Sequence, residues 1–340
     1  MSRTRAVLAA AIAILAGLAV PQASRADVSA QTAAAAKAEG TVVWYSSLDT
    51  VTLNTLVGIF NDTHPGIKLT ALQIGSAVIP ARVMTERAAG KYNADVVACD
   101  QFAFSQLAES DAFQPFKPSE PGKYIKGTLD PKGIWVAFFT DTTVIAWNPD
   151  RLRADGLKPP TSLADLAKPE WKGKLGIDGS AFNWYQGVLA TQKNARDMLK
   201  KMADNKPLIT SGHTSTITQL VNGEFDVTPT AYGYMAERAR LAGRPIEFLS
   251  PSPVSVGLEL VAILKNAPHP NAARVLVDWL LSPRVQQFFA DDGRTPTRTD
   301  IKSDLRVFNA KMPFYILPAP AKDEYNGLVS NFKAIFGIAG

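Results

Sequence analysis

The chain has 340 residues, of which 36 are Lys or Arg and 31 are Asp or Glu, so its formal net charge is +5 at pH 7. This length exceeds what one hydrophobic core usually organises, and we expect two lobes. Cys99 is the only cysteine, which excludes an internal disulfide.

The first 26 residues have the pattern of a secretory signal peptide. Arg3 and Arg5 precede an apolar stretch over 6–20, and Ser24-Arg25-Ala26 supplies small residues for cleavage near Ala26. This leader holds three Arg and no acidic residue, so its removal leaves 33 − 31 = +2. We therefore expect an exported, periplasmic protein with no nucleic acid partner.

The elements that follow alternate between strand and helix. The stretch "TVVWYSS" over 41–47 predicts a buried strand, and Leu53, Leu56 and Phe60 recur at helical spacing after it. Further strands are predicted near 67–71 and in "ADVVAC", with a helix over 77–89 between them and helical "FSQLAES" after them. This βαβαβ order predicts a doubly wound sheet, and no GxGxxG motif supports a dinucleotide site.

Two long strand-like stretches, 134–148 and 256–264, enclose a second α/β series. That series is predicted to contain strand 174–178, helix 182–204, helix 214–222, strand 226–230 and helix 233–242. We expect an α/β fold of two doubly wound lobes joined by hinge strands. Lobe 1 is assigned to 27–136 plus 257–340, with the C-terminal helices free to pack on either lobe, and lobe 2 to 137–256.

Small or hydrogen-bonding residues follow the predicted strands at their carboxyl ends. In open α/β sheets ligands bind outside these ends, so two facing lobes would form a cleft between them. The candidate ligand-binding residues are Ser46, Ser47, Asp49, Asp100, Gln101, Gly179, Ser180, Ala181, His213 and Tyr232.

Each candidate also has a purely structural interpretation. Asp49 and Asp100 stand where helices begin, and a carboxylate there caps free backbone N–H groups. Gly179-Ser180-Ala181 could cradle an anion at a helix start or provide an ordinary serine cap. His213 and Tyr232 could be a polar turn residue and a core ring.

An enzyme is not expected. The sequence has no GxSxG elbow, and Cys99 has no signature of a catalytic thiol. Asp49 and Asp100 could serve as the acid and base of a hydrolase, but nothing assigns them the different environments that this requires.

Several stretches in order resemble the periplasmic solute-binding proteins of bacterial ABC importers, in the ferric-iron-binding branch of the type II group. They are "VVWYSS", "ADVVACDQFAFSQLAESDAF", "KPEWKGKLGIDGSAF", "TQLVNGEFDV", "AYGYMAERA" and "AILKNAPHPNAARVLVDWLLSPRVQQ". The resemblance implies a monomeric clamshell that captures one solute and delivers it to an ABC permease of the inner membrane, without a resident cofactor.

The resemblance also implies a ligand set. Iron-binding members place a His, a Glu and two adjacent Tyr around Fe(III), and here these positions hold Asp49, Asp100, Tyr232 and Gly233. Asp49, Asp100 and Tyr232 are thus the candidate metal ligands, and ferric iron with an anion at Ser180-Ala181 is the leading hypothesis. A helix-start position of the family corresponds to His213.

The alternative hypothesis is a small organic anion or zwitterion. Relatives with this fold bind phosphonates, sugar phosphates, thiamine or polyamines. An anion cradle at Ser180 opposite carboxylates at Asp49 and Asp100 would suit a solute with an acidic head and an ammonium group.

Overall fold

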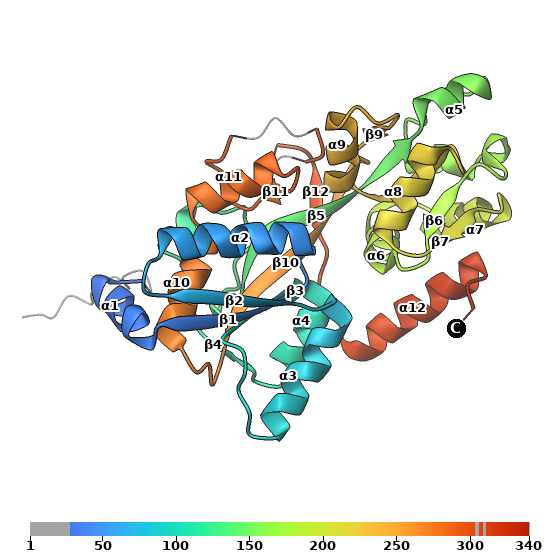
Figure 1. The fold of residues 1–340 in the computed structure, drawn as a ribbon. Helices are drawn as coiled ribbons and strands as arrows, with labels where there is room; N and C mark the ends of the chain where they lie inside the picture. The colour runs from blue at the N-terminus through green and yellow to red at the C-terminus, as the bar shows by residue number, and fades with distance from the viewer. Residues whose placement is uncertain (1–27, 303–305, 309–310, 340) are drawn as a thin grey trace, which may run out of the picture.

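The computed structural model describes residues 28–302, 306–308 and 311–339 (Figure 1). The predicted signal peptide over 1–26 lies outside these residues. Within the described part of the chain, no helix is long and apolar enough to cross a membrane.

The first half of the molecule is a sheet with the strand order β11-β5-β10-β3-β1-β2. Strands β1, β2 and β3 run parallel, whereas β10 pairs antiparallel with β3 and with β5. The bounds of these strands are Thr41–Ser46 (β1), Lys68–Gln73 (β2), Val96–Asp100 (β3), Val136–Trp147 (β5), Val254–Leu264 (β10) and Thr295–Pro296 (β11). The short β4, Phe113–Gln114, also pairs with β10.

Both faces of this sheet are covered by helices because side chains alternate along each strand. Val42 and Trp44 of β1 pack with one set of helices, while Tyr45 packs with the other. The first set is α1 (Ala30–Glu39), α2 (Thr50–Thr63), α10 (Pro270–Leu280) and α11 (Pro283–Asp291), and the second is α3 (Ile79–Ala88) and α4 (Gln101–Ala108). The predicted doubly wound sheet is therefore present.

The second half is built on the far end of β5. Beyond Thr142, β5 exchanges its partner β10 for β8 and β9, and β6 pairs in parallel with β7 nearby. These strands are β6 (Gly176–Asp178), β7 (Leu208–Thr210), β8 (Val227–Tyr232) and β9 (Glu247–Leu249). Their helices are α5 (Pro149–Ala154), α6 (Phe182–Thr191), α7 (Ala195–Asp204), α8 (His213–Asn222) and α9 (Gly233–Leu241). Short 3₁₀ helices lie at Ser76–Val78, Pro121–Lys123, Leu163–Ala167 and Pro169–Trp171.

The single helix predicted over 182–204 is wrong, because two helices occupy this range. Helix α6 ends at Thr191, and α7 begins at Ala195 after Asn194, whose φ of 54° is left-handed. Asparagine tolerates this conformation better than most residues, so the chain turns there.

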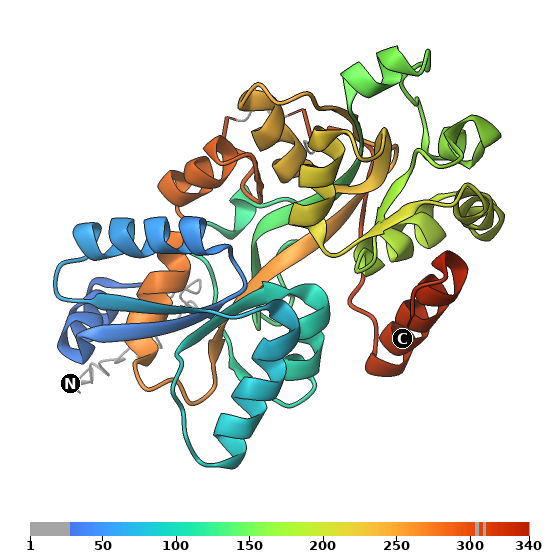
Figure 2. The ribbon, with the colours of Figure 1, turned by 45° about the vertical axis from the view of Figure 1, so that its right-hand side comes forward.

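The last helix, α12 (Lys322–Phe336), lies beside α6 and α7 (Figure 2). Its Phe332 is fully buried and contacts the rings of Phe182 and Tyr185. The strand before it, β12 (Phe314–Ile316), pairs with the first residues of β10. The C-terminal helix α12 thus packs on the second half, whereas α10 and α11 pack on the first sheet.

Candidate functional site

A cavity of about 250 Å³ lies where the two halves meet. The start of α4 and the 3₁₀ helix at Ser76 line one side, and the starts of α6 and α8 line the other. Five of the predicted residues line it, namely Asp100, Ser180, Ala181, His213 and Tyr232, together with Ser76, Ala77, Phe102, Thr143, Phe182, Asn183, Trp184 and Tyr325. These described residues bring carboxylate, hydroxyl, amide and aromatic groups to the lining, and none of them is a Lys or Arg.

Asp100 both caps a helix and lines the cavity. Its Oδ1 accepts the backbone N–H groups of Phe102 and Ala103 at 2.9 and 3.0 Å. The backbone N–H of Asp100 donates to the hydroxyl of Ser76 at 3.3 Å. The carboxylate is thus held in place while it remains partly exposed to the cavity.

A buried carboxylate outside the predicted set, Asp178, organises the opposite side. It ends β6 and accepts hydrogen bonds from the N–H of Ser180 at 2.9 Å, from its hydroxyl at 2.8 Å and from the N–H of Gly212 at 3.2 Å. Nδ1 of His213 lies 2.6 Å from its other oxygen. Although burial raises it, the pKa of Asp178 is lowered overall by His213 and Ser180.

One detail of the predicted anion cradle is wrong. The N–H of Ser180 already donates a hydrogen bond to Asp178 and cannot donate to an anion. Helix α6 nevertheless begins without a side-chain cap. Trp184, in its first turn, is 2% exposed, and no described residue accepts a hydrogen bond from its indole Nε1. The positive end of the α6 dipole therefore lies at the cavity, while the N–H groups of Ser180, Ala181 and Phe182 already donate within the protein.

Aromatic rings form the floor beside the α8 start. The rings of His213 and Tyr232 are stacked with centroids 3.6 Å apart, and Tyr234 stacks on Tyr232 at 5.9 Å. Burial, together with Asp141 and Asp100, raises the pKa of Tyr232 well above its usual value. The Tyr232 side chain is therefore a neutral phenol at physiological pH.

Two acidic residues on the long strands stand behind the cavity. Asp141 of β5 pairs with Gly257 of β10, and burial raises its pKa to about 6. Glu259 is 5% exposed, and its carboxylate accepts a hydrogen bond from the hydroxyl of Ser47. Burial and the neighbouring Asp141 raise its pKa well above the usual value. Both acids lie inside continuous strand patterns, so no local signal marks them in the sequence.

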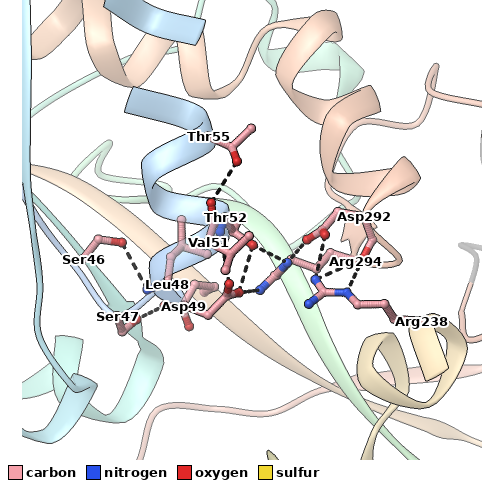
Figure 3. A network of polar contacts seen from close by, with 11 residues as sticks. Ser46, Ser47, Leu48, Asp49, Val51, Thr52, Thr55, Arg238, Asp292 and Arg294 are labelled. Carbon is pink, nitrogen blue, oxygen red and sulfur yellow. Dashed lines mark hydrogen bonds and ion pairs between the residues drawn. The ribbon is translucent and has the colours of Figure 1, made fainter. Parts of the chain in front are cut away.

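Asp49 does not line the cavity. It caps α2 by accepting the N–H of Thr52 at 3.0 Å, and it pairs with Arg294 at 2.7 Å (Figure 3). Burial opposes its ionisation, but the hydrogen bonds from Thr52 and Arg294 lower the pKa of Asp49 overall. Asp49 thus caps helix α2, as its structural interpretation predicted, and its negative charge is paired with Arg294.

Arg294 connects Asp49 to a wider network. Its guanidinium is buried, also pairs with Asp292, and lies over the ring of Tyr234 at 4.4 Å. Arg238 of α9 pairs with Asp292 at 2.7 Å from the other side (Figure 3). The network joins α2, α9 and the end of α11.

Four other predicted residues lie away from the cavity. The hydroxyl of Ser46 accepts the N–H of Leu48, and the N–H of Gly179 donates to the carbonyl of Thr210. The buried amide of Gln101 connects Leu258 with Leu317. Ser47, as described above, contacts Glu259 instead.

The three candidate metal ligands are not assembled around one point. Asp100 and Tyr232 line the cavity, but Asp49 is held by Arg294. Within the described ranges, no group of three or more His, Cys, Asp or Glu side chains is placed to hold a metal ion. At Gly233, a Cβ atom would lie 2.2 Å from Val307, so no larger residue fits there.

The comparisons with known proteins agree with this architecture. A family model described as "bacterial extracellular solute-binding protein" matches residues 55–311. Iron uptake protein A1 of Synechocystis sp. is 24% identical over 278 residues, which cover 73% of this chain and 73% of the relative.

Two solved structures are similar across nearly the whole chain. The periplasmic binding protein AfuA from Actinobacillus pleuropneumoniae, with exogenous fructose-6-phosphate bound, has a TM-score of 0.74 at 23% identity and covers 88% of this chain and 99% of its own. Iron-bound HitA from Pseudomonas aeruginosa has a TM-score of 0.70 at 19% identity and covers 87% and 98%. These similarities establish the α/β fold of the type II periplasmic binding proteins for this chain.

The family model covers most of the chain, and the fold and the cavity between its halves are those of a binding protein. The protein therefore belongs to the bacterial extracellular solute-binding proteins and is the substrate-binding component of an ABC importer rather than an enzyme.

Proposed function

We propose that the protein captures a small organic zwitterion and delivers it to an ABC permease. The observation that carries this proposal is the charge arrangement of the cavity. The carboxylate of Asp100 stands on one side, while the uncapped start of α6 stands on the other. A solute with an acidic group toward α6 and a positive group toward Asp100 would match both.

The anionic end of the solute would be held by dipoles and donors. The positive end of the α6 dipole attracts negative charge, and the side-chain amide of Asn183, which lines the cavity beside it, can donate a hydrogen bond. The cationic end would face Asp100, with the aromatic rings of Phe102 and Tyr232 beside it. Because none of the described lining residues is a Lys or Arg, an anion without a positive group is less well matched than a zwitterion.

The size of the cavity also supports an organic solute. A volume of about 250 Å³ is many times the ~10–15 Å³ of cavity that holds one water molecule. This space suits a compact molecule and is far larger than a single metal ion needs.

Ferric iron is supported by the iron-related names of relatives but not by the side chains. Asp49 is paired with Arg294, and Gly233 stands at the position where the iron-binding pattern has its second Tyr. We therefore expect no visible charge-transfer band when Fe(III) is added to the purified protein. Appearance of such a band, together with its loss in Tyr232→Phe, would overturn the zwitterion proposal.

The direct test is calorimetric titration with small zwitterions such as phosphoethanolamine and γ-aminobutyrate. Asp100→Asn keeps an N-cap side chain but removes the charge, so we expect affinity to fall by about tenfold or more. Asp49→Asn is the matched control, because Asp49 also caps a helix but lies away from the cavity. Equal losses in both variants would contradict the assignment of Asp100.

A further inference from the structure

A small side pocket opens from the cavity at the hinge strands. Its volume is about 10 Å³, and it shares Thr143, Asn183, Trp184 and Tyr232 with the larger cavity. Its remaining lining comes from Asp141, Thr142, Ser255, Gly257 and Leu317. A solute in the main cavity can therefore extend one water-sized group into this pocket.

The side pocket contains a buried acceptor that the protein leaves unused. Oδ1 of Asp141 is buried, and no described residue donates a hydrogen bond to it. Asp141 and Gly257 are opposite each other in an antiparallel ladder, so their side-chain positions lie on one face. Native proteins rarely leave a buried carboxylate oxygen without a partner, and a donor group of a bound solute would supply the missing hydrogen bond.

The charges around Asp141 favour a cation in the pocket. Asp100 is an acidic neighbour of Asp141, and Glu259 lies close by, where burial first and then the charges of Asp141 and Asp100 raise its pKa. Arg294 and His213 also lie near Asp141, and each already contacts a carboxylate of its own. A positive group that donates hydrogen bonds would satisfy Asp141 and offset the cost of burying its charge.

On these grounds, and resting on the proposed function, we infer that the side pocket binds a primary ammonium group of the solute, with Asp141 as its hydrogen-bond acceptor. The ring of Trp184 or Tyr232 provides an aromatic wall for this cation. The pocket has the size of one unsubstituted ammonium, so a trimethylated amine does not enter it.

The test uses three probes that share a phosphate group and differ at the amine. Phosphoethanolamine carries a primary ammonium, phosphocholine a trimethylated one and ethyl phosphate none. We expect phosphoethanolamine to bind the full mature protein at least about tenfold more tightly than either of the others, as measured by calorimetry.

Two variants test the pocket itself. Asp141→Asn removes the charge at constant size, and Gly257→Ala places a methyl group 3.5 Å from the carbonyl of Asp141 and 3.8 Å from Nδ2 of Asn183. That methyl group makes ordinary contacts and fills the pocket. Both variants should lose most of the preference for phosphoethanolamine over phosphocholine. Gly58→Ala, in α2, is the matched control and should keep it, because a Cβ there meets no described atom within 4 Å.

The outcomes separate the inference from the proposal on which it rests. Equal affinity for phosphoethanolamine and phosphocholine, or an unchanged preference in Asp141→Asn and Gly257→Ala, overturns the ammonium pocket but leaves zwitterion binding intact. Failure of all three probes and of γ-aminobutyrate to bind overturns the proposed function and the inference together. Circular dichroism of each variant confirms that a lost preference does not reflect unfolding.

Discussion

The charged side chain of Asp141 lowers the free energy of unfolding of the ligand-free protein. Its pKa of about 6 lies above the ordinary value of 3.8, because burial disfavours its charged form. The folded state therefore holds this proton to a higher pH than the unfolded state does. Stability consequently falls as the pH rises from about 4 to about 6, and the loss persists above that range.

Asp141→Asn should therefore stabilise the protein without ligand. A shift of about two pKa units corresponds to roughly 3 kcal/mol, so we expect a gain of about 1–3 kcal/mol in the free energy of unfolding at pH 7.5. At pH 4 the gain should nearly vanish, since the carboxyl is then largely protonated in the folded protein. Urea unfolding at the two pH values checks this, and a destabilised variant at pH 7.5 would contradict it.

Asp49 should behave in the opposite way. Its lowered pKa means that its contribution to stability is present above about pH 4 and is lost as the pH falls further. Asp49→Ala removes both the cap of α2 and a partner of buried Arg294, so we expect unfolding to become easier by about 1–3 kcal/mol at pH 7. Solute affinity should stay within about twofold of wild type. A large loss of affinity with unchanged stability would restore Asp49 as a ligand-binding residue.

Single residues are predictable where a strand end and a helix start coincide. Asp100, Ser180 and Tyr232 stand at such junctions, and the cavity contains all three. Asp178 also stands at such a junction, at the end of β6, so the same rule could have included it. Asp141 escapes prediction because it lies within a twelve-residue strand. The roles of Asp178 and Asp141 depend on partners distant in sequence, which no local pattern reveals.

At the scale of elements, the strands and helices of the first sheet follow directly from hydrophobic periodicity. The division of 182–204 into α6 and α7 does not, because the polar residues Thr-Gln-Lys-Asn at 191–194 include no Gly or Pro to mark the break. The position of α12 could not be derived either. Its buried face makes aromatic contacts with α6 and also lies against α7, and only the folded chain brings these helices together.

The packing of α12 gives a prediction for that element. Phe332 is fully buried against Phe182, which lines the cavity, so Phe332→Ala should destabilise the protein by about 3–5 kcal/mol. We expect solute affinity to weaken as well, because the start of α6 loses its support. Leu241→Ala is the control, since Leu241 is 63% exposed and its loss should cost about 0.5 kcal/mol or less. Denaturant unfolding and calorimetry measure the two effects.

For the whole molecule, β5 and β10 are the elements that both halves share. Strand β5 changes its pairing partner between Thr142 and Thr143. We propose that lobe 1 and lobe 2 meet there and that closure bends the chain at this point, with solute contacts from both lobes favouring the closed state. The Arg238–Asp292 pair, which links α9 to the end of α11, lies across the same junction.

Closure around a solute makes a prediction for the whole molecule. A ligand that binds only the folded state at a concentration of 100 times its Kd adds about 2.7 kcal/mol to the free energy of unfolding. We expect this gain with phosphoethanolamine, together with a smaller radius of gyration in solution scattering. An unchanged radius at saturation would show that binding occurs without closure of the lobes.

The crowding at Gly233 limits how this binding protein could be redesigned. Adding a second phenolate ligand for a trivalent metal would require Tyr in place of Gly233. Val307 would first have to be replaced by a smaller residue, because its methyl carbon occupies the position of the new side chain. One substitution would only push the neighbouring segment aside. Conversion to an iron carrier therefore takes at least two coordinated changes, and a library of single mutants should not yield one.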